Sequence, residues 1–193
     1  VDPHKGAKAI SGVAEAKRLG LVGLAFHPAV QRFDPSDRRL GSIWEVAEEL
    51  DLVVLVHTGS SAFGAGEPGG TGVDLSFGDP MLMDRVAADY PGLRIVLAHS
   101  SRLWLDRTIA IARHKANVWV DLAGWSPKRL PADLLDAVRG PLTDVVLFGS
   151  GHPFGDVDGW LSAWDGLGMT DEVTERVLAG NASRLLRLDG QSS

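Results

Sequence analysis

The sequence predicts an α/β protein built around a parallel β-sheet. Five short segments are apolar at successive rather than alternate positions, which is the pattern of strands buried on both faces. Segments with helical periodicity separate them, and parallel strands need such crossovers. The predicted strands span residues 21–26, 52–56, 93–98, 118–120 and 145–148. A length of 193 residues favours a single domain.

The helices between these strands are predicted from their ends and from the spacing of apolar residues. Gly20 follows the first one and suits the left-handed position after a helix end. In the second, apolar residues recur at three- and four-residue intervals and form one face. The expected helices span residues 7–19, 40–50, 80–90, 104–115, 131–138, 170–180 and 181–188. Capping residues are expected at Asp79, Ser100, Ser101 and Asn181.

A long glycine-rich loop, residues 59–78, follows the second predicted strand. Within it, Gly64, Gly66 and Gly69 match the G-x-G-x-x-G spacing of dinucleotide-binding loops. Pro68 and the glycines after it prevent this segment from opening a helix, so the dinucleotide interpretation fails. Loops of this length in compact domains are typically functional lids or mobile segments.

Composition limits the classes of partner and ligand. The net charge is −6 and the basic residues are scattered among acidic ones, which argues against nucleic acid and anionic membranes. The chain has no cysteine, so a metal ion would be held by imidazole and oxygen ligands. It also lacks an apolar segment of membrane-spanning length and a signal-peptide pattern. A cytoplasmic protein is therefore expected.

Four of the six histidines lie just past the carboxyl end of a predicted strand. Parallel α/β folds build their sites at this edge, and neutral imidazoles converging there suit a divalent transition metal. Any one of them could be a simple hydrogen-bonded rim residue, but four on one edge favour a site. These histidines are His27, His57, His99 and His152. Asp121 lies at the same edge and is interpreted as a cap.

Several motifs together resemble a known enzyme family. They are GLVGLAFHP at 20–28, LVVLVHTG at 52–59, DP…LRIVLAHS at 79–100, VWVDLAGWSPKRLP at 118–131, VLFGSGHPF at 146–154 and GNASRLL at 180–186. In order and spacing they are similar to amidohydrolase family 2, the metal-dependent TIM-barrel hydrolases and decarboxylases. The resemblance implies that the predicted strands are the last five of eight βα units. Residues 1–193 would then be a single, incomplete barrel domain lacking the N-terminal units.

The resemblance also implies roles for the four histidines. His57 matches a metal-binding histidine and His99 matches the histidine that acts as catalytic acid or base. His27 and His152 are the expected substrate-binding residues. The implied cofactor is a divalent metal ion, zinc ahead of manganese. The implied reaction is hydrolysis or decarboxylation of a small carboxylate, lactone or ester.

Two departures from the family pattern matter. The last-strand motif reads Gly149-Ser150-Gly151 where the family has Gly-Ser-Asp, and the first-strand His-x-His pair has no counterpart. His152 is not expected to replace the aspartate, because neighbours on a strand point to opposite faces. An alternative function is therefore a catalytically inactive, degenerate barrel that serves as a binding or partner subunit. Five parallel strands leave two open sheet edges, so a homo-oligomer is expected.

Overall fold

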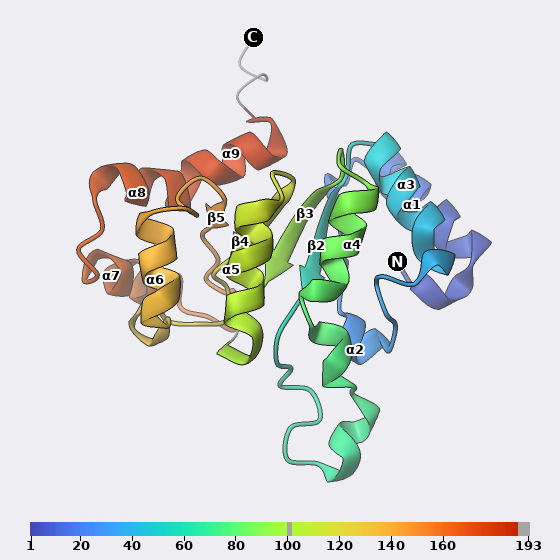
Figure 1. The fold of residues 1–193 in the computed structure, drawn as a ribbon, viewed down its shortest axis with the longest axis horizontal. Helices are drawn as coiled ribbons and strands as arrows, with labels where there is room; N and C mark the ends of the chain where they lie inside the picture. Colours follow the sequence, from blue (N-terminus) through green and yellow to red (C-terminus); the bar gives the residue numbers. More distant parts are fainter. Residues whose placement is uncertain (100–101, 189–193) are drawn as a thin grey trace.

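The computed structural model describes residues 1–99 and 102–188, so the caps expected at Ser100 and Ser101 lie outside the described residues. Its centre is one parallel sheet in which the spatial order β1-β2-β3-β4-β5 equals the chain order (Figure 1). The strands are β1 (Gly23–Phe26), β2 (Val53–His57), β3 (Arg94–Ala98), β4 (Val118–Asp121) and β5 (Val146–Leu147). The predicted α/β class and all five strands are confirmed, and three of the strands, β1, β3 and β5, are shorter than predicted.

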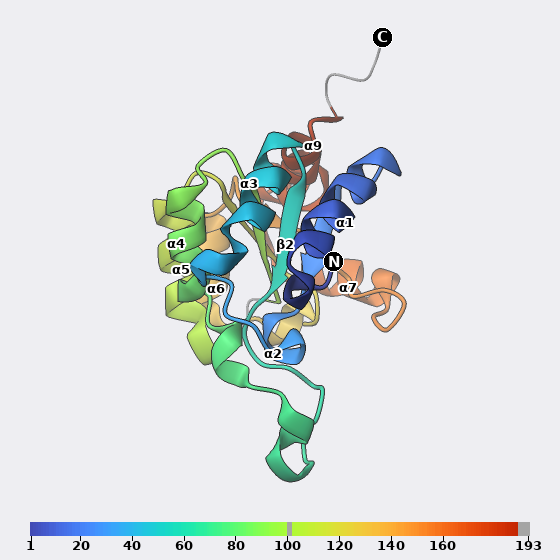
Figure 2. The same cartoon turned by 90° about the vertical axis from the view of Figure 1, so that its right-hand side faces the viewer.

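The outer face of the sheet is covered by helices in chain order (Figures 1 and 2). Every second strand residue, such as Val54, Val56, Ile95 and Leu97, packs here with apolar side chains of the helices. The covering helices are α1 (Ala7–Arg18), α3 (Gly41–Glu49), α4 (Met81–Asp89), α5 (Leu105–His114) and α6 (Ala132–Arg139). This packing forms the larger apolar core of the protein.

The inner face of the sheet carries a second, smaller core. Val53, Val96, Trp119 and Leu147 pack there against Leu185 of the last helix, α9 (Asn181–Leu186). Burial on both faces explains why the strands are apolar at successive positions.

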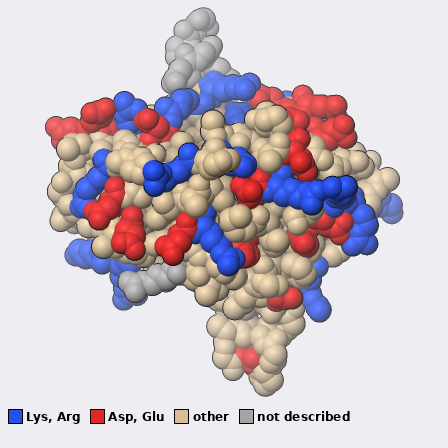
Figure 3. Space-filling view, in the orientation of Figure 1, with Lys and Arg blue, Asp and Glu red and all other residues tan. Residues whose placement is uncertain are grey.

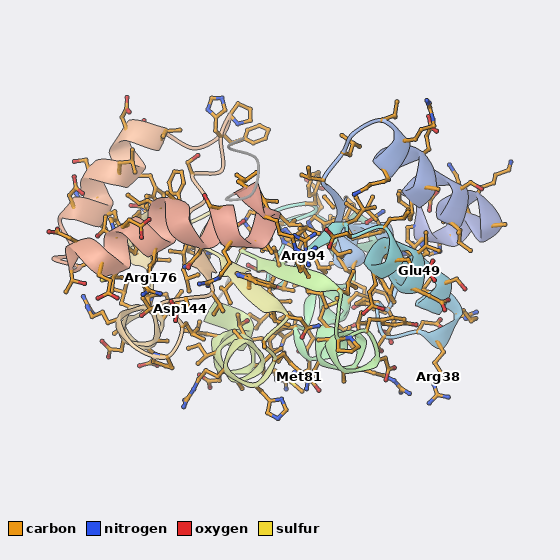
Figure 4. The ribbon with its side chains drawn as sticks, turned by 90° about the horizontal axis from the view of Figure 1, so that it is seen from above. Arg38, Glu49, Met81, Arg94, Asp144 and Arg176 are labelled. Carbon is orange, nitrogen blue, oxygen red and sulfur yellow. The ribbon has the colours of Figure 1, made fainter. Side chains whose placement is uncertain are left out.

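Arg94 ties this helix to the sheet. Its guanidinium donates to the Leu185 carbonyl and, at 2.9 Å, to the Asp51 carbonyl. In Figure 4 Arg94 lies between the strands and α9.

Three further helical segments lie between β5 and α9, and the first of them was not predicted. This helix, α7 (Val157–Asp165), buries Trp160, Ala163 and Trp164 on one face. No element was predicted over residues 157–165, although Trp160, Ala163 and Trp164 have helical spacing. The helix predicted over residues 170–180 divides into α8 (Asp171–Glu175) and a π-helical turn (Arg176–Gly180).

The capping role predicted for Asn181 is wrong. Asn181 is the first residue of α9 and is almost fully buried, and Gly180 holds the capping position. Its side-chain amide instead donates to the carbonyls of Thr143, at 2.8 Å, and Val146, at 2.7 Å. Asn181 therefore joins α9 to β5 rather than terminating a helix.

The glycine-rich segment leaves the body of the protein below the carboxyl edge of the sheet (Figures 1 and 2). Its two ends meet, because the Gly59 N–H donates to the Gly78 carbonyl at 2.8 Å. It contains two 3-10 helices, Pro68–Gly72 and Leu75–Gly78. The remaining short helices are α2 (Pro28–Gln31) and the 3-10 helices Pro3–Lys5, Arg38–Leu40, Arg102–Trp104 and Pro127–Arg129.

Acidic and basic side chains are interspersed on the face shown in Figure 3, with no continuous basic stripe. Several of them form ion pairs, such as Lys115 with Asp84 at 2.9 Å and Arg176 with Asp144. No helix in the part of the chain that the structure describes is long and apolar enough to cross a membrane.

Candidate active site

The register of the sheet places two of the predicted histidines side by side. Phe26 of β1 pairs with Val56 of β2, so the residues that follow them, His27 and His57, lie at the same level. Their rings stack with centroids 3.7 Å apart and planes 13° apart. The parallel pairing therefore brings together two imidazoles that are 30 residues apart in sequence.

A third imidazole joins this pair through an unusual backbone conformation. His99 follows β3 with φ at 61°, in the left-handed region that few non-glycine residues adopt. Its ring centroid lies 4.6 Å from that of His57, with 42° between the planes. Strain of this kind recurs at functional sites, where the surrounding structure maintains it. His27, His57 and His99 are called the imidazole cluster below.

His152 lies apart from this cluster. It follows β5 on an exposed segment, and its backbone N–H donates to the Ser150 hydroxyl at 3.2 Å. Among the described residues, ring contacts link the members of the imidazole cluster to one another and to Phe63, but not to His152. The structure therefore brings together three of the four predicted histidines.

Hydrogen bonds define which ring nitrogens of the cluster carry protons. The Nε2 atom of His57 lies 3.0 Å from the Ser60 carbonyl, and the Nδ1 atom of His99 lies 3.0 Å from the Ala123 carbonyl. A carbonyl only accepts, so these nitrogens are the protonated ones in the neutral rings. Nδ1 of His57 and Nε2 of His99 then carry a lone pair rather than a proton. The Nδ1 atom of His27 is buried without a hydrogen-bond partner among the described residues.

Burial keeps the first two imidazoles neutral. Loss of hydration lowers the pKa of His57 to about 4, although its bond to Ser60 acts in the opposite direction. Burial also lowers the pKa of His27. Both rings are therefore uncharged near pH 7, which is the form that binds metal ions and accepts hydrogen bonds.

The other side of the site is formed by the segments after β4 and β5. Asp121 acts as a cap, as predicted, because its Oδ1 accepts the Ala123 N–H at 2.7 Å. Burial raises the pKa of this carboxyl group, against the effects of the Ala123 N–H and the His99 ring. Gly124 packs against His99, since a Cβ there would lie 2.5 Å from the His99 Nδ1.

Gly151, which stands where the family pattern has aspartate, has a backbone that suits glycine. Its φ is 73°, a value that L-residues rarely adopt. Space is not the constraint, because the nearest atom to an added Cβ would be the Gly124 nitrogen at 3.6 Å. The glycine is thus accompanied by a left-handed turn, and an aspartate here would be strained.

A cavity of about 470 Å³ opens beside these glycines. Trp125 and Trp160 form its apolar wall, and the Trp160 indole N–H donates to the Trp125 carbonyl at 3.0 Å. Gly124 lines the cavity and contacts His99, so the cavity adjoins the imidazole cluster. This cavity was not predicted from the sequence. The position of Trp125 just after a strand end was the one available signal.

The donor atoms and ring orientations of the imidazole cluster determine whether it can hold a metal ion. Its neutral nitrogen donors suit zinc and manganese. However, no three His, Cys, Asp or Glu side chains among the described residues are placed to hold an ion. The rings of His27 and His57 are also stacked in nearly parallel planes. Because a nitrogen lone pair lies in the plane of its ring, the two rings cannot both direct a lone pair at one ion. As arranged, the described side chains do not fit a bound metal ion.

A parallel βα sheet with histidines along its carboxyl edge is typical of the TIM-barrel class, and comparison with known proteins specifies the family. The family model described as amidohydrolase matches residues 2–188. The chain therefore belongs to amidohydrolase family 2, as the sequence motifs predicted. No curated protein matches the sequence significantly.

Similar solved structures are TIM-barrel proteins and decarboxylases. An uncharacterized TIM-barrel protein from Bordetella bronchiseptica has a TM-score of 0.80 and 27% identity, over 94% of this chain and 63% of its own. The 5-carboxyvanillate decarboxylase from Sphingomonas paucimobilis has a TM-score of 0.72 and 18% identity, over 96% and 64%. A dihydroxybenzoic acid decarboxylase from Polaromonas, with bound manganese and 2-nitroresorcinol, has a TM-score of 0.68 and 17% identity, over 97% and 67%.

The chain spans less than two thirds of the length of the first two structures. The likeness to the two decarboxylases, at less than 20% identity, establishes the fold. Together with the five parallel strands, it confirms the prediction of an incomplete TIM-type barrel.

Proposed function

We propose that this chain supplies the imidazole side of an active site that decarboxylates or hydrolyses a small carboxylate, lactone or ester. The observation that carries the proposal is the cluster of His27, His57 and His99 at the carboxyl edge of a parallel sheet. Membership of the amidohydrolase family supports an enzyme. Decarboxylation is the first reaction to test, because structural neighbours act on carboxyvanillate and dihydroxybenzoate. The chain is shorter than those neighbours, so the proposal concerns the site of the whole protein.

His99 is the proposed proton-transfer residue. Its Nδ1–H is bound to the Ala123 carbonyl, which leaves Nε2 as the atom that can take or give a proton. In a decarboxylation the carbon that loses CO2 must gain a proton, and in a hydrolysis water must lose one. A histidine with one fixed nitrogen and one free nitrogen can serve either reaction.

His27 and His152 are the proposed substrate-binding residues. The buried Nδ1 of His27 lacks a partner among the described residues, and a polar substrate group would satisfy it. His152 is exposed at the rim, between Gly151 and Phe154, both of which line the cavity. Trp125 and Trp160 would then contact the apolar part of the substrate.

The proposed cofactor is a divalent metal ion, zinc ahead of manganese, with His57 as one ligand. Manganese is present in two neighbouring decarboxylase structures, which supports a metal in the family. Because the described side chains do not complete a metal site, further ligands would have to come from outside them. This chain by itself is therefore expected to retain less than one zinc ion per molecule after dialysis, measured by elemental analysis.

The function is tested by assaying the chain with zinc or manganese. The substrates are 2,6-dihydroxybenzoate, followed as CO2 release, and an aryl lactone, followed as acid release. We expect turnover with one class of substrate, abolished in His99→Gln and retained in His114→Gln, a surface control. If all proteins are inactive but bind 2,6-dihydroxybenzoate in the cavity, the alternative of a non-catalytic binding subunit is favoured.

A further inference from the structure

We propose that Asp121 is a positioning residue for His99, acting through the backbone of Ala123. The proposal rests on the proton-transfer role proposed above for His99. It assigns to Asp121 the task of keeping the His99 proton on Nδ1, so that Nε2 stays free to react. Asp121 itself need not touch substrate.

Two hydrogen bonds connect the carboxylate to the imidazole. The Oδ1 atom of Asp121 accepts the Ala123 N–H at 2.7 Å, and the Ala123 carbonyl accepts the His99 Nδ1–H at 3.0 Å. Ala123 therefore has both of its backbone polar groups engaged, one by each side chain. The Asp121 bond fixes the orientation of this residue, and with it the direction of the carbonyl that selects the His99 tautomer.

Close packing of two glycines supports the same arrangement. A Cβ on Gly149 would lie nearer than 3.0 Å to both the Asp121 Oδ1 and the Ala123 Cβ. A Cβ on Gly124 would lie 2.5 Å from the His99 Nδ1. The backbone of Gly149 therefore packs against Asp121, and the backbone of Gly124 packs against His99. A side chain larger than that of glycine at either position would displace the carboxylate or the imidazole.

From its position in the sequence alone, Asp121 is expected to cap a loop, with no connection to His99. It sits at the end of a strand, where a carboxylate commonly caps the following loop. Asp121 differs from an ordinary cap because it caps Ala123, and the carbonyl of Ala123 accepts the hydrogen bond from the His99 ring.

The test is to measure the His99 tautomer by long-range proton–nitrogen NMR of the metal-free chain at pH 7.5. In the wild type we expect the Nδ1–H tautomer at His99 and the opposite, Nε2–H tautomer at His57, which is an internal reference. Asp121→Ala is expected to give His99 a mixture of tautomers and to leave His57 unchanged. Asp121→Asn keeps an oxygen acceptor for the Ala123 N–H and is expected to restore the single tautomer.

A second variant guards against misfolding of the aspartate variants. Gly124→Ala leaves Asp121 intact but places a methyl group against the His99 Nδ1, and should also remove the single tautomer. Retention of the Nδ1–H form in Asp121→Ala, with a native amide spectrum, would overturn the proposal. So would an Nε2–H tautomer at His99 in the wild type.

A kinetic measurement separates this proposal from the proposed function. In an active form of the enzyme, Asp121→Ala should lower kcat by about tenfold or more with little change in KM, the size usual for loss of an orienting partner. Asp121→Asn should recover most of kcat. If the enzyme has no activity at all, the proposed function fails, whereas the tautomer measurement still decides the role of Asp121.

Discussion

At the scale of single residues, the imidazole cluster makes the stability of the protein depend on pH. His57 is neutral and half-buried in the folded state, with its pKa lowered to about 4, against about 6.5 in an unfolded chain. Between these two values the unfolded state binds more protons than the folded state. Unfolding therefore becomes easier as the pH falls through this window.

We accordingly expect the metal-free chain to have its full stability above about pH 6.5 and to lose stability progressively toward pH 4. Urea denaturation at a series of pH values, with a chelator present, measures this. His57→Gln should show a smaller loss across the same window. His114→Gln should behave like the wild type. An equal loss in His57→Gln and the wild type would show that other groups control the pH dependence.

The backbone at Gly151 gives a second prediction at this scale. Because φ is 73°, replacement by aspartate should destabilise the protein by about 1 kcal/mol, the cost of a left-handed L-residue. Gly151→Ala should cause a similar loss, since the strain lies in the backbone. Urea midpoints provide the measurement. Gly166→Ala, at a φ of −67°, is the control and should not destabilise the protein.

If instead Gly151→Asp is as stable as the wild type, the turn can change to accommodate the family aspartate. The aspartate of the family pattern would then fit at position 151 without loss of stability.

At the scale of elements, the least predictable contact is the one between α9 and β5. Asn181 is buried and its amide donates to two carbonyls, those of Thr143 and Val146. Strand β5 has only two residues with regular pairing, so this side chain replaces part of its ladder. The hydrogen bonds of Asn181 explain why α9 packs at this end of the sheet.

Asn181→Ala is expected to destabilise the protein by about 2 kcal/mol, because it leaves the buried Val146 carbonyl and the partly buried Thr143 carbonyl without this donor. Thermal or urea unfolding measures the loss. Ser183→Ala, two residues after Asn181 in the same helix, is the control and should change stability by less than about 0.5 kcal/mol. A loss no greater than that of the control would mean that water replaces the amide at both carbonyls.

At the scale of the whole molecule, the sheet is open at β1. This strand pairs with β2 on one side, and within the described residues no strand covers its other side. Ala25 on its inner face is exposed, and Val22 and Leu21 just before it are 64% and 52% exposed. An unpaired apolar edge of this kind promotes association with further strands.

We therefore expect the chain to self-associate at micromolar concentration, measured by sedimentation velocity. Val22→Lys should shift the distribution toward monomer, because a charge at an edge opposes strand pairing. Met81→Lys removes a comparable exposed apolar side chain from α4 and should leave the distribution unchanged. Purely monomeric wild-type protein at high concentration would contradict the proposal of a homo-oligomer.

The sequence by itself determined the architecture and the position of the site. Strands buried on both faces must be apolar at successive positions, so residues such as Val53 and Val54 indicated the sheet directly. The register of parallel strands then carries residues at strand ends to one edge, which is why His27, His57 and His99 could be assigned together. Helix α7 was not predicted from the sequence, and it is stabilised by the burial of Trp160 and Trp164 in the core.

Only the tertiary structure decided how the groups at that edge interact. The stacking of His27 on His57 depends on strand register to within a single residue, and the approach of His99 depends on one left-handed dihedral angle. The turn at Gly151 and the connection from Asp121 through Ala123 involve contacts between separate loops. Apolar patterning reports which residues are buried, because burial is a property of each position. It does not report ring orientations or the tautomer of His99, which arise from contacts between residues distant in sequence.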